Sequence, residues 1–176
     1  SGERVYLRTA PIDPRDPFRG DFVRLSYSLN NVDVSRFRSS TPASSLKRDA
    51  KVYAVLAPSA MGVYQLDYLT DRKPSSGVFL LGRVNRDVSG GQIQLRYGIE
   101  QYFVQQGRGV EIEDKRGAGN ALQIPMEVEL AVGSRGQAVL VAYRWSRIGI
   151  RLEQNTELAT EERGEGAPPR SPLLIV

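Results

Sequence analysis

Short apolar runs separated by turns that contain glycine or proline constrain this chain to a strand-dominated fold. In residues 21–29, the apolar side chains of Val23, Leu25, Tyr27 and Leu29 alternate with polar ones. A period of two is typical of a strand with one buried face. The same signals predict further strands at residues 4–9, 51–57, 63–70, 77–84, 92–97, 126–132, 136–146 and 149–153.

We expect a mainly β fold, an open barrel or sandwich of antiparallel strands with one or two short helices. The helical spacing of Ile99, Tyr102 and Phe103 predicts a helix over residues 98–104, and a second is expected over 109–115. Residues 33–37 predict a single helical turn. The stretches 52–66 and 128–140 resemble each other, which indicates either two similar β units or the generic likeness of hairpins.

A length of 176 residues suits one domain with a core of its own. We place that domain at residues 1–153. Residues 154–176 are rich in Glu, Gly and Pro at first and are expected to form a tail. The last four residues, 173–176, are apolar and could dock on the domain as an edge strand.

Composition removes several classes of chemistry. The chain has no Cys and no His, and so lacks thiol nucleophiles, disulfides, the commonest general base and the commonest transition-metal ligand. Its 24 Lys and Arg residues against 20 Asp and Glu give a net charge of +4. These cations are dispersed among acids instead of forming a block, so we expect no nucleic-acid partner.

The acidic side chains between residues 11 and 21 are the main candidates for acid–base or metal chemistry. Asp13, Asp16 and Asp21 are close in sequence, but Arg15 and Arg19 lie among them. Neighbouring guanidinium groups favour ionised, paired carboxylates over a general acid. The spacing also departs from that of a calcium-binding loop. We therefore expect no catalytic residue, no metal and no cofactor.

Residues 11–27 read P-I-D-P-R-D-P-F-R-G-D-F-V-R-L-S-Y and resemble the GDYXXLXY-motif family of bacterial membrane-anchored proteins. The motif's defining positions are occupied by Gly20, Asp21, Leu25 and Tyr27. Phe22 stands where the motif has its first Tyr, so no hydroxyl is present there. Residues 97–104 and 136–140 are similar to later blocks of the same family.

The motif has two interpretations. In the first it is a structural corner, formed by Gly20, Asp21, Phe22, Leu25 and Tyr27, in which glycine permits the turn and aspartate closes it. In the second, the loop that precedes the motif lines an interaction or binding site, with the candidates Asp13, Arg15, Asp16, Phe18 and Arg19. The aromatic residues Tyr97, Tyr102 and Phe103 are either a recognition surface or the packed face of the expected helix.

The resemblance implies an N-terminal membrane anchor ahead of residue 1, a location on the extracytoplasmic side of the inner membrane, and association with a multi-pass membrane protein. We therefore expect a non-enzymatic interaction domain in the bacterial cell envelope. The alternative is a ligand-binding or hydrolytic domain that acts on an envelope polymer or peptide, centred on residues 11–21.

Overall fold

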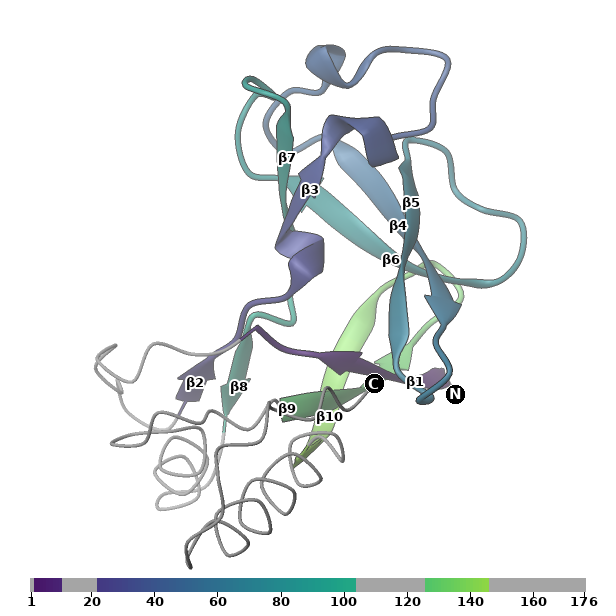
Figure 1. Cartoon of the computed structure of the whole chain (residues 1–176), viewed down its shortest axis with the longest axis vertical. Helices are drawn as coiled ribbons and strands as arrows, with labels where there is room; N and C mark the ends of the chain where they lie inside the picture. The colour runs from purple at the N-terminus through teal and green to yellow at the C-terminus, as the bar shows by residue number, and fades with distance from the viewer. Residues whose placement is uncertain (1, 11–21, 104–125, 146–176) are drawn as a thin grey trace, which may run out of the picture.

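The computed structural model describes residues 2–10, 22–103 and 126–145, which form antiparallel β-sheets (Figure 1). The strands are β1 (Glu3–Arg8), β2 (Phe22–Arg24), β3 (Asn31–Asp33), β4 (Lys51–Pro58), β5 (Tyr64–Thr70), β6 (Val78–Val84), β7 (Gln92–Arg96), β8 (Gln101–Phe103), β9 (Met126–Val132) and β10 (Ala138–Trp145). Each named pair of neighbouring strands runs antiparallel. The predicted mainly β fold class is confirmed.

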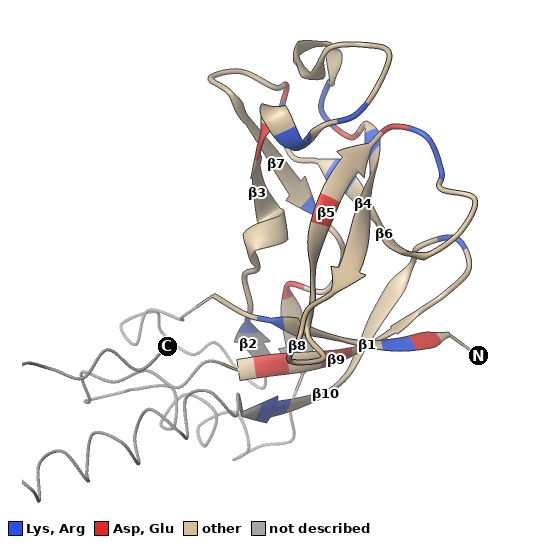
Figure 2. Ribbon diagram, turned by 45° about the vertical axis from the view of Figure 1, so that its right-hand side comes forward, with Lys and Arg blue, Asp and Glu red and all other residues tan. Residues whose placement is uncertain are grey.

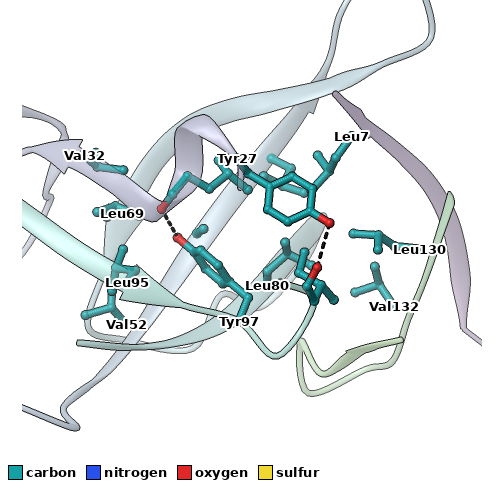
Figure 3. Packing of buried hydrophobic residues seen from close by; sticks show 14 of the residues in the cluster. Leu7, Tyr27, Val32, Val52, Leu69, Leu80, Leu95, Tyr97, Leu130 and Val132 are labelled. Atoms are coloured by element: carbon teal, nitrogen blue, oxygen red, sulfur yellow. Dashed lines mark hydrogen bonds between the residues drawn. The ribbon is translucent and has the colours of Figure 1, made fainter. Parts of the chain in front are cut away.

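The largest sheet has five strands in the order β3–β7–β6–β4–β5 and curves into a half-barrel. In β3, β4 and β7 alternate residues are buried, as the period of two predicts, whereas β6 buries three consecutive residues and β5 buries only Leu69. The most deeply buried residues of this sheet, each at most 1% exposed, are Val52, Ala54, Leu69, Leu80, Val84, Ile93 and Leu95. Figure 3 shows several of these side chains converging in the core. Burying each of the Val, Leu and Ile side chains contributes about 1.5–3 kcal/mol, so this face provides much of the stability.

A second sheet, with the order β1–β9–β10, lies at the end of the molecule that holds the N-terminus (Figure 1). Its buried residues Val5, Val128 and Leu130 belong to the same hydrophobic cluster as the core of the five-stranded sheet. The short strands β2 and β8 pair with each other beside it. The two larger sheets therefore share one apolar core.

The hairpins β4–β5 and β9–β10 have matching registers, which supports the predicted similarity of two β units. The pairs next to the two turns are Pro58–Tyr64 and Val132–Ala138. At the same distance beyond the turn, each hairpin has a β-bulge that leaves one residue of its second strand without a partner: Asp67 in β5 and Val141 in β10. A generic likeness of hairpins does not require a bulge at the same position.

The tips of these hairpins join the two sheets. Each turn contains a glycine with positive φ, Gly62 at 74° and Gly136 at 84°. Val63, next to the first turn, forms an isolated parallel bridge with Tyr6 of β1. In the second turn the carbonyl oxygen of Gly136 accepts a hydrogen bond from the N–H of Leu81 in β6, at 2.8 Å. Each tip thus contacts a strand of the other sheet.

The predicted helix over residues 98–104 is wrong. Gly98 has a φ of 81°, which starts a turn, and β8 follows it and pairs with β2. The helical spacing of the apolar residues was misleading because a pairing with a distant strand decides the conformation here. Within the described parts of the chain, the helical elements are three single 3-10 turns: η1 (Ser28–Asn30), η2 (Val34–Arg36) and η3 (Ala43–Ser45).

The helical turn predicted at residues 33–37 is confirmed as η2. The strand predicted over 21–29 is shorter than expected, because β2 ends at Arg24 and η1 follows it. The sequence did not predict β3. The expected helix at 109–115, the strand at 149–153 and the tail at 154–176 lie outside the described residues, so those predictions stand untested.

Candidate functional site

The second half of the motif is buried and bonded to the block at residues 97–104. Leu25 and Tyr27 are each 4% exposed. The hydroxyl of Tyr27 donates a hydrogen bond to the carbonyl oxygen of Ile99 at 2.7 Å, inside the core (Figure 3). The N–H of Leu25 donates to the carbonyl oxygen of Glu100, also at 2.7 Å. For these two residues, the contacts are those of a structural corner.

Tyr97 makes the reciprocal contact. It is 7% exposed, and its hydroxyl donates to the carbonyl oxygen of Leu29 at 2.8 Å (Figure 3). Burial raises the pKa of Tyr97 well above its ordinary value, and the charge of Glu100 raises it further. Tyr97 is therefore a neutral anchor in the core. Tyr102 and Phe103 lie in β8, and the structure does not describe their side chains, so their role in recognition remains a prediction.

Two polar residues that the sequence reasoning did not single out connect these segments. The side-chain oxygen Oε1 of Glu100 accepts from the N–H of Tyr97 at 2.7 Å and from Nδ2 of Asn30 at 3.1 Å. The other amide atom of Asn30, Oδ1, accepts from the N–H of Tyr27 at 2.7 Å. The only signal in the sequence was the presence of Glu100 within a block that resembles the family.

Beside this corner is a groove of about 920 Å³, between β1, β3 and β5. Buried apolar residues form its floor, and they include Tyr27 from the motif. The floor consists of Leu7, Tyr27, Leu29, Val32 and Val63. Exposed, mostly polar side chains surround it, among them Arg8, Asp33, Arg36, Met61 and Gln65. A volume of this size lies within the range typical of ligand and peptide sites.

The groove lies between two sheet edges. β3 pairs only with β7 and β5 only with β4 among the named strands, so the other edge of each borders the groove. Two isolated bridges lie along the same edge of β5, Tyr6–Val63 at its start and Phe37–Leu69 near its end. Between these bridges β5 is an edge strand, and backbone groups on its outer edge can form hydrogen bonds with a bound segment.

Arg36 reaches from η2 across to β5. Its Nη2 atom donates to the carbonyl oxygens of Leu66 at 2.8 Å and Asp67 at 2.7 Å. The β-bulge at Asp67 lies at this position, and it interrupts the regular alternation of carbonyl directions along the β5 edge. Arg36 therefore holds the β3 and β5 edges at a defined separation and satisfies two carbonyl groups that would otherwise face solvent.

The groove has the chemistry of a binding site. The N–H of Ser35 lies 2.8 Å from Oδ1 of Asp33 and is the main reason that the pKa of this carboxyl is held below its ordinary value. Asp33 is therefore ionised near neutral pH and poorly suited to act as a general acid. Within the described ranges, no three His, Cys, Asp or Glu side chains lie together as metal ligands. The apolar floor, the polar rim and the two strand edges that border the groove fit an extended peptide.

The remaining candidate residues are not covered by the structure. The motif residues Gly20 and Asp21 lie outside the described residues, as do the loop candidates Asp13, Arg15, Asp16, Phe18 and Arg19. Phe22 is in β2, but its side chain is not described. Their proposed roles stand as predictions.

The comparisons with known proteins identify one family. A family model described as GDYXXLXY protein matches residues 1–142. That range includes the motif, the block at 97–104 and every residue that lines the groove. No curated protein and no solved structure matches the chain significantly.

Proposed function

The chain belongs to the GDYXXLXY protein family, and on the basis of its groove we propose that it is a non-enzymatic interaction domain that binds an extended segment of a partner protein. The observation that supports this most directly is the pair of β-edges that border one apolar groove. An added strand gains main-chain hydrogen bonds from a sheet edge, and its alternate side chains enter pockets of the floor.

Three properties of the groove support a peptide in preference to a small polar substrate. Its floor is apolar, and Met61 at its rim is a large apolar side chain that is 47% exposed. Between the bridges at Val63 and Leu69 the edge of β5 has no partner among the named strands, a length that suits a short extended segment. Arg36 donates to two of the edge carbonyls, so this edge accepts hydrogen bonds from outside its own sheet, and an added segment would displace Arg36 at these two positions.

We further propose that the partner is a multi-pass membrane protein and that the domain lies on the extracytoplasmic side of the inner membrane, held by an N-terminal anchor. This part of the proposal rests on the family resemblance of residues 11–27 and 97–104. In the described part of the chain, no helix is both long and apolar enough to cross a membrane. The anchor and the partner both need direct tests.

Site-specific photo-crosslinking tests the groove. A photo-reactive residue replaces Gln65, an exposed rim residue of β5, in the full-length protein in the cells that produce it. The matched control carries the same residue at Lys73, which is exposed and does not line the groove. We expect Gln65 to capture a multi-pass membrane protein, with the crosslink mapped by mass spectrometry to one extramembrane segment, and Lys73 not to do so.

Two results would contradict this proposal. Equal capture of one protein from both positions would mean that the groove does not select the partner. Capture of a glycan or of nothing at position 65 would remove the peptide assignment, and a glycan would favour the alternative of a domain that acts on an envelope polymer.

A further inference from the structure

Three exposed cations form a row across the five-stranded sheet, away from the groove. Lys51 in β4 pairs in register with Arg83 in β6, and Arg83 pairs with Arg96 in β7. All three side chains are exposed, and none lines the groove. Figure 2 shows the basic positions of β4, β6 and β7 in the half of the molecule that lies away from the N-terminus. We call these three residues the basic row.

Like charges directly opposite one another on adjacent strands are destabilising, so the basic row needs a counter-charge. Asp49 supplies part of it. Its carbonyl oxygen accepts from Nη1 of Arg83 at 2.9 Å, and its Oδ1 accepts from Nη2 of Arg96. Arg48 adds a third guanidinium, with Nε at 4.0 Å from Oδ2. One carboxylate thus faces three arginines, which leaves an excess of positive charge.

The arginines of the basic row are held in place by further contacts. The Nη1 atom of Arg96 donates to the carbonyl oxygen of Val84 at 3.2 Å and to Oδ1 of Asn85 at 3.1 Å. Asp49 is the one described non-glycine residue with a positive φ, 67°, a conformation that costs free energy but which aspartate tolerates. The guanidinium groups are therefore ordered before any ligand arrives, which lowers the entropic cost of binding.

Lys51 differs from its two neighbours. Among the described residues it has no ion pair and no side-chain hydrogen bond. Its ammonium group is therefore available at one end of a row whose other two members already donate to Asp49, Arg83 to its carbonyl oxygen and Arg96 to its carboxylate.

We infer that the basic row is a second interaction surface, which binds the carboxylates of a short acidic segment of a partner protein. Adjacent strands are about 4.8 Å apart, so the row extends over about 10 Å, a span that fits two or three acidic side chains. Asp49 shows how a carboxylate is received there, since its Oδ1 accepts from Nη2 of Arg96, while Arg83 donates to its backbone carbonyl oxygen. Because the carboxylate of Asp49 already lies beside Arg96 and Arg48, a short acidic segment fits better than a long polyanion, which would meet this acid.

A fluorescein-labelled hexaglutamate peptide, titrated with the complete 176-residue chain and followed by fluorescence anisotropy at low salt, tests this inference. We expect Lys51→Gln to weaken binding about threefold to fivefold, as for the loss of one exposed ion pair. Since Lys51 has no side-chain partner among the described residues, its replacement should leave the melting temperature unchanged. The control Arg135→Gln removes the same charge from an exposed turn and should leave affinity unchanged.

Several outcomes would overturn the inference. The absence of measurable binding, or an equal loss of affinity in Arg135→Gln, would show that the basic row is not a specific site and contributes only to the net charge of the chain. Tighter binding to a single-stranded oligonucleotide or to phosphatidylglycerol vesicles, with the same dependence on Lys51, would assign the row to phosphate-bearing polyanions. This assay does not involve the groove, so its failure leaves the crosslinking test at Gln65 intact.

Discussion

Removing the hydroxyl of Tyr27 tests whether the motif acts as a structural corner. In Tyr27→Phe the ring stays in the core, but the carbonyl oxygen of Ile99 loses the hydrogen bond that it accepts at 2.7 Å. Ile99 is fully buried, at 0% exposure, so water does not replace the lost donor without rearrangement of the core. The substitution therefore removes a buried polar contact between the motif and the block at residues 97–104.

The expected destabilisation follows from the burial of that carbonyl. Leaving one buried hydrogen-bonding group without a partner costs about 1–3 kcal/mol. For a chain of this length, 1 kcal/mol lowers the melting temperature by roughly 2–4 °C. We therefore expect Tyr27→Phe to unfold about 2–12 °C below the unmodified chain, with a lower urea midpoint and an unchanged m-value.

Circular dichroism during thermal and urea unfolding measures this change, and Tyr53→Phe is the matched control. The hydroxyl of Tyr53 has no hydrogen bond to a described residue, and its ring contact with Phe79 survives the substitution. The control should stay within about 0.5 kcal/mol of the unmodified chain. If both variants unfolded at the same temperature, the Tyr27–Ile99 bond would not be a stabilising part of the corner, and the structural interpretation would be wrong.

Two further predictions use the hairpin turns and the basic row. In thermal unfolding, Gly136→Ala should destabilise the chain by more than Gly62→Ala. Both glycines have a positive φ, which disfavours alanine equally at the two positions. At Gly136, however, the added Cβ would also lie 2.8 Å from the backbone nitrogen of Leu81, whereas at Gly62 it would meet no atom within 4 Å. Similar losses would show that the close approach is unimportant. The hydrogen bond from Arg96 lowers the pKa of the Asp49 carboxyl below its ordinary value of 3.8. The ionised carboxylate therefore stabilises the folded chain fully above pH 3.8, and this stabilisation is lost as the pH falls through the lowered pKa of the folded state. Asp49→Asn should therefore differ most from the parent near neutral pH and converge with it in acid; a constant difference across the titration would contradict this.

Much of the strand content was predictable because the core faces of the strands are periodic. In β9 the predicted and observed bounds agree, and β4 extends one residue past the predicted end. The buried positions of Leu25 and Tyr27 also follow from the alternation in residues 21–29. Such patterns are visible in the sequence because side chains of a strand alternate between two faces whatever its partner is.

The errors occur where a distant partner decides the structure. Residues 98–104 had helical spacing but pair as β8 with β2, whose residues lie far earlier in the chain. Three-residue β3 is too short to show a period, and its conformation depends on β7. The groove could not be predicted for the same reason, since its lining comes from β1, the motif segment, β3 and the β4–β5 hairpin.

The sequence by itself determined the fold class, most of the strands, the family, and the burial of the second half of the motif. The tertiary structure decided which edges stay open, where the groove lies, and that Lys51, Arg83 and Arg96 form one row. The physical reason is the range of the interactions. The alternation of apolar residues is local and is imposed by backbone geometry, whereas register, edge exposure and charge alignment depend on which distant strands bury the most apolar surface together.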